Sequence, residues 1–333
     1  MVHFPSFVNG LAKTVSNKKE KNFPKDDARK AIEELAKEAR KNELLLKSSG
    51  VVKSNKDNGF VSVFTNRGQK GVNQDCLMVW EEFGGQQDMM FCGVYDGHGA
   101  WGHFVAKRVR KLVPAFLLCN WKENVAGTSI NLDFKMEADK NIHGLDLWKQ
   151  SYIKTYAAVD QDLKQHTGFD SFRSGTTALT IIKQGENLII ANVGDSRVVL
   201  ATTSEDGTLF PLQLTTDFKP NLPKEAERIE QSKGRVFCMK DEPGVYRVWM
   251  PNDVTHTKLT TRDQFIILAT DGVWDVVSNQ EAVKIVSTTP HKEKAGQRLV
   301  KYAMREWKRK KSGIAMDDMS AICLFFHTKL VVD

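Results

Sequence analysis

The feature that most constrains this sequence is a set of aspartates placed where apolar, strand-like runs meet loops. The stretch "GVYDGHGAWG" (93–102) ends the apolar run "MMFCGVY" and places Asp96, Gly97 and His98 side by side. Four more aspartates occupy comparable positions: Asp75, Asp195, Asp271 and Asp317. One aspartate at a strand end is an ordinary turn residue. Five of them predict a place where several strand ends bring carboxylates together.

Carboxylates that converge raise one another's pKa unless a cation stabilises their charge. Ligand sets made only of oxygen select hard ions such as Mg²⁺ or Mn²⁺, and no His or Cys cluster in the sequence favours a softer metal. Gly97 fits such a site because a residue without a side chain lets a backbone carbonyl approach an ion closely. His98 is a candidate general acid, since imidazole titrates near neutral pH. The alternative is a histidine that is simply hydrogen-bonded in its loop.

The order of the expected elements predicts the fold class. Strands are expected at 60–65, 76–80 and 89–96, and long helices at 101–121 and 145–166. Further strands and helices follow without regular alternation of strand and helix, which favours antiparallel sheets with helices packed outside. Ser278 and Glu281 form a predicted capping box at the start of a late helix. The chain is therefore expected to be an α+β protein.

Length and composition limit the organisation and the partners. The 333 residues, 41% hydrophobic, can bury one large core. We expect residues 1–55 to be a basic N-terminal extension with one helix, and residues 56–330 to be the main domain. The net charge of +7 would suit an acidic partner, but no nucleic-acid-binding motif is present. We therefore expect no nucleic-acid partner.

At this point the sequence resembles a known family. The segments "FCGVYDGHGAWGHFVAKRV", "ANVGDSRVVLAT", "FIILATDGVWDVVSNQEAV" and "MDDMSAICLF" occur in the order found in metal-dependent type 2C protein phosphatases, with plant members the most similar. The resemblance covers roughly residues 58–328 and rests mainly on DGHGxxG followed by DGxWD.

The resemblance implies a central antiparallel β-sandwich flanked by helices, in α-β-β-α layers, with a two-metal site at one end. Asp75, Asp96, the Gly97 carbonyl, Asp271 and Asp317 would hold two Mg²⁺ or Mn²⁺ ions, and Asp195 would serve a third, weaker ion. His98 would protonate the leaving alkoxide. The implied activity is hydrolysis of phosphoserine and phosphothreonine in phosphorylated protein substrates by a metal-activated water, carried out by a monomer.

Three positions or segments depart from the family pattern. Lys70 stands where many members place a phosphate-binding arginine, and Arg67 lies close enough in sequence to compensate. Gln74 replaces a common glutamate. Between "GVYRVWMP" and "RDQFIIL" the family stretch GLAxSRAxGD is missing, and only "NDVTHTKLTT" is present. The sandwich is therefore expected to be shorter by about two strands, with unpaired strand edges. The alternative function is a catalytically impaired, partner-binding protein.

The N-terminal sequence and the hydropathy bear on localisation. Similar plant proteins begin with a glycine at position two that accepts a myristoyl chain, and this chain has Val2. Neither a secretory signal nor an apolar run of about 18 residues is present. We expect cytoplasm or nucleus, no stable membrane insertion, and at most weak contact of the early lysines with an anionic membrane surface.

Overall fold

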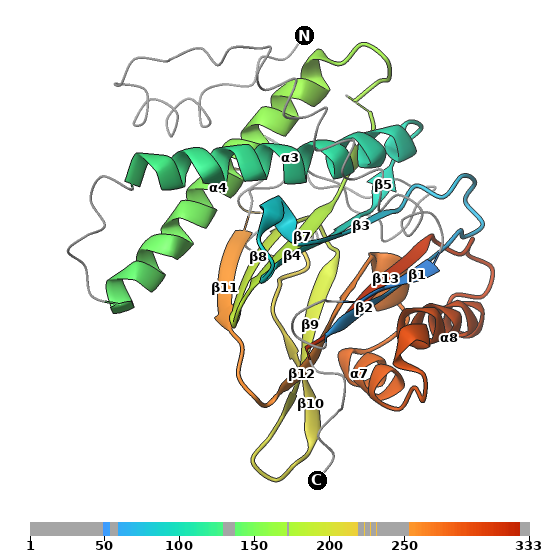
Figure 1. The fold of residues 1–333 in the computed structure, drawn as a ribbon. Helices are drawn as coiled ribbons and strands as arrows, with labels where there is room; N and C mark the ends of the chain where they lie inside the picture. The colour runs from blue at the N-terminus through green and yellow to red at the C-terminus, as the bar shows by residue number, and fades with distance from the viewer. Residues whose placement is uncertain are drawn as a thin grey trace.

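The computed structural model describes residues 49–53, 59–128, 137–171, 173–218 and 253–326, together with the isolated positions 223, 227 and 231. Two antiparallel sheets pack face to face, and helices cover the outer face of each (Figure 1). This arrangement confirms the predicted α-β-β-α layers. The helix expected near residue 26 lies outside the described residues.

One sheet has five strands in the order β11-β8-β7-β4-β3. Its members are β3 (Cys76–Glu81), β4 (Met89–Tyr95), β7 (Ala178–Gln184), β8 (Asn187–Val193) and β11 (Asp253–Lys258). Two long helices, α3 (Gly102–Thr128) and α4 (Glu137–Gln165), pack on its outer face. A short 3-10 helix, η1 (Phe83–Gly85), joins β3 to β4.

The second sheet has six strands in the order β1-β2-β13-β12-β9-β10. Its members are β1 (Ser49–Lys53), β2 (Phe60–Asn66), β9 (Arg197–Thr203), β10 (Leu209–Gln213), β12 (Asp263–Ala269) and β13 (Met319–Phe325). Its outer face is covered by α7 (Asn279–Ser287) and α8 (Ala295–Lys310), which the 3-10 helix η3 (Lys292–Lys294) connects. Because β1 pairs with β2, this sheet already includes residues before the predicted boundary at 56.

Alternation along the strands explains why the two sheets stack. In β12, Phe265 and Ile267 pack toward α7 and α8, whereas Ile266 and Leu268 point into the layer between the sheets. Successive side chains of a strand point to opposite faces. Because β12 is apolar on both faces, it is buried on both and lies in the interior of its sheet.

The structure confirms several local predictions. The strands expected at 60–65, 76–80 and 89–96 correspond to β2, β3 and β4. The α7 capping box is also present: Glu281 N donates to Ser278 Oγ at 3.2 Å, and Ser278 N donates to Glu281 Oε2 at 2.8 Å.

The residues that remain where the family stretch is missing form a strand. Most of "NDVTHTKLTT" becomes β11, which pairs with β8 from Asp253↔Asn192 to Lys258↔Asn187. As a result β8 is paired on both sides, with β7 and with β11, and β11 is the edge strand of this sheet. Within the described ranges, no helix combines the length and the apolar character needed to cross a bilayer.

Candidate functional site

The predicted site begins at the N-terminal end of β3, where Asp75 is buried with 8% of its surface exposed. Thr270, which follows β12, donates its hydroxyl to Asp75 Oδ2 at 3.0 Å and accepts from the Ser320 N–H at 3.0 Å. A single buried threonine therefore links the starts of β3 and β13 to the end of β12. The other carboxylate oxygen of Asp75, Oδ1, is buried and accepts no hydrogen bond from a described residue.

Asp96 and Gly97 follow β4 and are held by a short ladder. β5 (Gly97–His98) pairs with β6 (Gly175–Thr176). The backbone N–H of Asp96 donates to Thr177 Oγ1 at 2.9 Å, and the Thr177 N–H donates to the Asp96 carbonyl at 2.8 Å. Thr177 Oγ1 lies 3.0 Å from Ser196 Oγ, next to Asp195 in the turn between β8 and β9. This chain of contacts ties the Asp96 loop to the Asp195 turn.

Gly97 is required by its neighbours in the fold. A Cβ at this position would lie 2.5 Å from the Gly102 carbonyl oxygen and 2.8 Å from the Gln74 carbonyl oxygen. Three backbone segments therefore meet at Gly97, at the start of α3. The glycine of the DGHG motif is therefore also needed for close approach of the backbone. From the sequence, Gly97 is explained only by the approach of its carbonyl to an ion.

Asp271 is the first residue of the short helix α6 (Asp271–Trp274), directly after β12. The residue after it, Gly272, has no space for a side chain because a Cβ would lie 2.0 Å from the Asp318 carbonyl oxygen. The α6 turn therefore packs directly against the turn before β13 that carries Asp317. All five predicted acidic positions lie at strand ends or in turns at one end of the sandwich.

Burial and mutual repulsion define the electrostatics of this cluster. Burial raises the pKa of Asp75 to about 7, with contributions from the carboxylates of Asp318 and Asp317. The pKa of Asp96 is raised well above its ordinary value by burial and by the charges of neighbouring carboxylates, in decreasing order Asp75, Asp271, Asp195 and Asp317. The five predicted acids therefore act on one another electrostatically, and a cation at this place would relieve their repulsion.

The donor chemistry fits a hard divalent ion. The cluster offers only carboxylate and carbonyl oxygens, and Asp75 Oδ1 is a buried acceptor without a hydrogen-bond donor. In the part of the chain that the structure describes, no three His, Cys, Asp or Glu side chains converge tightly enough to form a ready-made ion site.

A lysine is associated with the same carboxylates. Lys70 Nζ lies 2.6 Å from Asp317 Oδ2, with 53% and 26% of the two side chains exposed. Burial lowers the pKa of Lys70, but its hydrogen bond to Asp317 and the charges of Asp271 and Asp96 raise it overall. Arg67 is exposed, and its side chain forms no ion pair with the described residues. Of these two cations, Lys70 is the one that contacts a carboxylate of the cluster.

His98 is exposed beside this cluster. It pairs with Gly175 in the β5–β6 ladder, and its Nε2 would lie 2.7 Å from a Cβ placed on Gly175. The ring therefore lies over Gly175 at the surface, two residues from Asp96. In this position it can exchange protons with solvent.

Asp318 is a site residue that the sequence interpretation missed. Its Oδ1 accepts from the Gly68 N–H at 2.7 Å and its Oδ2 from the Gln74 N–H at 2.8 Å. It therefore fixes both ends of the loop that carries Lys70. The adjacent pair of aspartates in "MDDMS" was the available signal, although the sequence does not say which of the two faces the loop.

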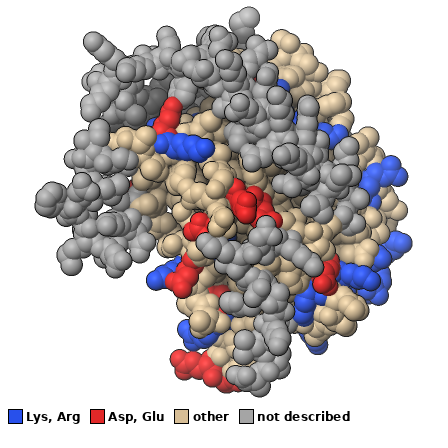
Figure 2. All heavy atoms as spheres, viewed as in Figure 1, with Lys and Arg blue, Asp and Glu red and all other residues tan. Residues whose placement is uncertain are grey.

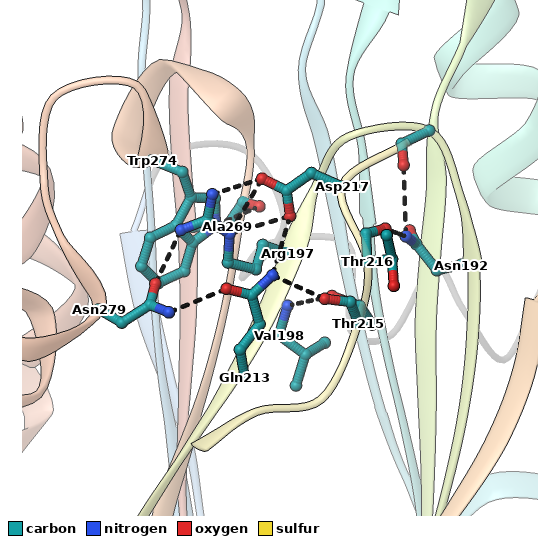
Figure 3. Close-up of polar contacts among 11 residues, drawn as sticks. Asn192, Arg197, Val198, Gln213, Thr215, Thr216, Asp217, Ala269, Trp274 and Asn279 are labelled. Carbon is teal, nitrogen blue, oxygen red and sulfur yellow. Dashed lines mark hydrogen bonds and ion pairs between the residues drawn. The ribbon is translucent and has the colours of Figure 1, made fainter. Parts of the chain in front are cut away.

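A second missed element is the network around Arg197 at the start of β9 (Figure 3). Its guanidinium forms a bidentate ion pair with Asp217, with Nε 2.9 Å from Oδ1, and donates from Nη1 to Asn279 Oδ1 at 2.7 Å. It also lies over the Trp274 ring, 5.1 Å from the centroid. Trp274 in turn donates from Nε1 to the Ala269 carbonyl at 2.9 Å. Arg197 thus joins the turn that carries Asp195 to the α6 turn that carries Asp271.

One protein family and several known proteins are similar to this chain. The family profile described as "Protein phosphatase 2C" matches residues 60–312. "Probable protein phosphatase 2C 34" of Arabidopsis thaliana is 53% identical over 356 aligned positions, which cover 98% of this chain and 98% of that protein. "Probable protein phosphatase 2C 48" of Oryza sativa subsp. japonica is 45% identical over 360 positions, covering 98% and 99%. An alignment of 356 positions against a chain of 333 residues leaves at least 23 positions without a residue of this chain, which agrees with a missing segment.

The solved structures show the same fold. The crystal structure of serine-threonine phosphatase 2C from Toxoplasma gondii superposes with a TM-score of 0.71 at 21% identity, covering 84% of this chain and 98% of that chain. The profile match covers well over half of the chain, and the relatives at about 50% identity cover nearly all of it. The chain therefore belongs to the protein phosphatase 2C family of serine/threonine phosphatases.

Proposed function

We propose that the carboxylate cluster binds two Mg²⁺ or Mn²⁺ ions and hydrolyses phosphoserine and phosphothreonine in protein substrates. The ligands would be Asp75, Asp96, the Gly97 carbonyl, Asp271 and Asp317, and Asp195 would serve a third, weaker ion. The observation that carries this proposal is Asp75 Oδ1, a buried acceptor without a hydrogen-bond donor among carboxylates that raise one another's pKa. Two bound divalent ions supply charge neutralisation and a water of lowered pKa for attack on phosphorus.

The protein side chains have separate roles in this reaction. The exposed imidazole of His98 would protonate the leaving alkoxide, since it lies at the surface next to the Asp96 loop. Lys70 would orient the substrate phosphate from the rim of the cluster, after exchanging its contact with Asp317 for one with the phosphate. Arg67, exposed three residues earlier, would add a second cation at the rim. Thr270 and Asp318 would hold the loops in place, and the monomer would suffice because every proposed ligand comes from one chain.

The intact carboxylate set favours hydrolysis over the alternative of a catalytically impaired, partner-binding protein. The residues that remain at the missing stretch pair β11 with β8 beside the Asp195 turn, and β11 forms the edge of this sheet. The shorter segment does not remove a proposed ligand.

The test is phosphate release from a phosphothreonine peptide by the purified chain, in Mn²⁺ and then in excess EDTA. The matched variants are Asp96→Asn, within the cluster, and Asp146→Asn, an exposed position on α4. We expect Mn²⁺-dependent turnover that EDTA abolishes, a loss of at least about 100-fold for Asp96→Asn, and no change for Asp146→Asn. A folded chain without turnover in Mn²⁺ would support the binding alternative.

A further inference from the structure

A basic cavity lies on the outer side of α8, and none of its lining residues belongs to the carboxylate cluster. Its volume is about 260 Å³. We call it the α8 groove, and its lining residues are Thr289, Pro290, His291, Lys294, Gln297, Arg298, Lys301 and Arg305. Five of these eight side chains are basic and none is acidic, so the cavity is suited to an anion.

The helical spacing of α8 produces this arrangement. Leu299, Val300, Ala303 and Trp307 are buried against the six-stranded sheet. Lys294, Arg298, Lys301 and Arg305 follow one another at intervals of four, three and four residues, so they line the opposite, exposed face. The loop 289–291 after α7 closes the groove at its N-terminal side. Figure 2 shows lysine and arginine side chains gathered over α8, at the right of the view.

The cations of the groove are not neutralised by carboxylates of the described residues. Arg298 donates to the hydroxyl of Thr289 at 3.3 Å, and Arg305 donates from Nε to the Lys301 carbonyl at 3.3 Å. Both partners are uncharged.

The next turn of the same helix behaves differently. Arg309 and Lys310 form ion pairs with Glu306, at 2.5 Å and 3.2 Å. The sequence thus places a carboxylate against the basic residues at the end of α8 and leaves the groove without one. Burial, and to a smaller degree the nearby positive charge of Arg298, lowers the pKa of Lys292 beside the groove.

We propose that the α8 groove binds a phosphorylated serine or threonine of a protein substrate, at a residue other than the one being hydrolysed. Arginine and lysine side chains donate charge-assisted hydrogen bonds to phosphate oxygens. A cavity of about 260 Å³ is smaller than the usual site of a drug-sized ligand and suits a single phosphorylated side chain. The groove holds no carboxylate that could bind a metal, so it binds phosphate without hydrolysing it. This inference rests on the proposed function, because it assumes that the substrates are phosphoproteins.

The experiment measures binding of a fluorescent peptide that carries one phosphothreonine, and of its unphosphorylated form, by anisotropy in EDTA so that no turnover occurs. The groove variant is Arg298→Gln with Lys301→Gln. The control is Lys284→Gln with Lys308→Gln, which removes the same charge at exposed positions outside the groove. Equal melting temperatures of the unmodified chain, the groove variant and the control would confirm that the variants fold. If the groove variant does not fold, the single variant Arg305→Gln takes its place.

We expect the groove variant to lose at least roughly tenfold in affinity for the phosphopeptide, and the control to match the unmodified chain. The unphosphorylated peptide should bind weakly to all three. Equal losses in groove and control variants would overturn the proposal, because they would indicate non-specific attraction. The proposal would also be overturned if the groove variant lost binding to vesicles of anionic lipid but bound the phosphopeptide as the unmodified chain does. That result would assign the groove to a membrane surface.

Turnover of p-nitrophenyl phosphate in Mn²⁺ separates this inference from the proposed function. That small substrate cannot reach both sites, so the groove variant should hydrolyse it at the unmodified rate. If the unmodified chain fails to hydrolyse it while groove binding persists, the proposed function fails and the groove remains a phosphate-binding site.

Discussion

Lys70 and Asp317 form a contact of 2.6 Å between ammonium and carboxylate, so the residue proposed to orient phosphate is held by a residue proposed to bind metal. The two roles compete for Asp317. On the proposed roles, an ion bound at Asp317 Oδ2 would replace the Lys70 ammonium, and the released lysine would then be available to the substrate. Metal binding and substrate binding would in this way be linked through one side chain.

The first prediction follows from this competition. Lys70→Met should tighten Mn²⁺ binding by roughly two- to fivefold, as expected for removal of an exposed ion pair, and should raise the KM for a phosphopeptide. Calorimetric titration with Mn²⁺ and steady-state kinetics measure the two effects. Arg67→Met is the control for the Mn²⁺ titration, since it removes a nearby exposed cation that forms no ion pair with Asp317. Mn²⁺ affinity that is unchanged in Lys70→Met would argue against the competition.

The second prediction concerns Arg197. Arg197→Met should destabilise the fold by about 3 kcal/mol, because it leaves the mostly buried carboxylate of Asp217 without its ion pair. It should also weaken Mn²⁺ binding, since Arg197 joins the Asp195 turn to the α6 turn. Urea unfolding measures the free energy of unfolding, and titration measures the affinity for Mn²⁺. Arg262→Met, at an exposed position, should change neither. If Arg197→Met lowers stability and leaves Mn²⁺ binding unaffected, the network is structural only.

The third prediction concerns the glycine of the DGHG motif. Gly97→Ala places a Cβ 2.5 Å from the Gly102 carbonyl oxygen, so we expect a loss of about 1–3 kcal/mol in the free energy of unfolding. Gly144→Ala, in α4 with no atom within 4 Å of the added Cβ, should instead stabilise by up to about 1 kcal/mol. Urea denaturation of both variants provides the comparison. Equal effects at the two positions would contradict the close packing at Gly97.

The fourth prediction is a pH dependence. Hydrogen bonds from Ser278 lower the pKa of Glu281, so its ionised form stabilises the folded state above the unfolded pKa of about 4.3. That stabilisation is lost as the pH falls through the lower, folded-state pKa. Glu281→Gln should therefore lower the melting temperature at pH 7 and have little effect near pH 3. Glu205→Gln, at an exposed position, should show no such trend. A difference that stays constant over this pH range would exclude the charge of Glu281 as its cause.

The sequence predicted antiparallel sheets with helices packed outside from the order of its strand-like and helical stretches, and its family resemblance implied the α-β-β-α layers. It also placed five aspartates at expected strand ends, which is a local pattern. It did not reveal Arg197, whose partners Asp217 and Asn279 lie 20 and 82 residues away along the chain. Asp318 was missed for a related reason: its partners Gly68 and Gln74 are about 250 residues distant in sequence. Contacts of this kind depend on which strand ends the topology brings together.

The missing segment is a case in which the sequence showed the change but not its structural result. The absent motif was evident in the sequence, but its effect on pairing was not, because "NDVTHTKLTT" carries no apolar alternation that indicates a strand. In the structure these residues supply the edge strand beside β8 by backbone hydrogen bonds, which any sequence without proline can form.

The most direct test of the proposed metal site is the number of Mn²⁺ ions bound per chain, measured by calorimetry together with phosphate release in the same samples. We expect saturation near two ions, turnover that rises in parallel with occupancy, and loss of both in Asp271→Ala. Turnover that persists in EDTA, or Mn²⁺ binding that is unchanged in Asp271→Ala, would show that this carboxylate cluster is not the metal site of the phosphatase.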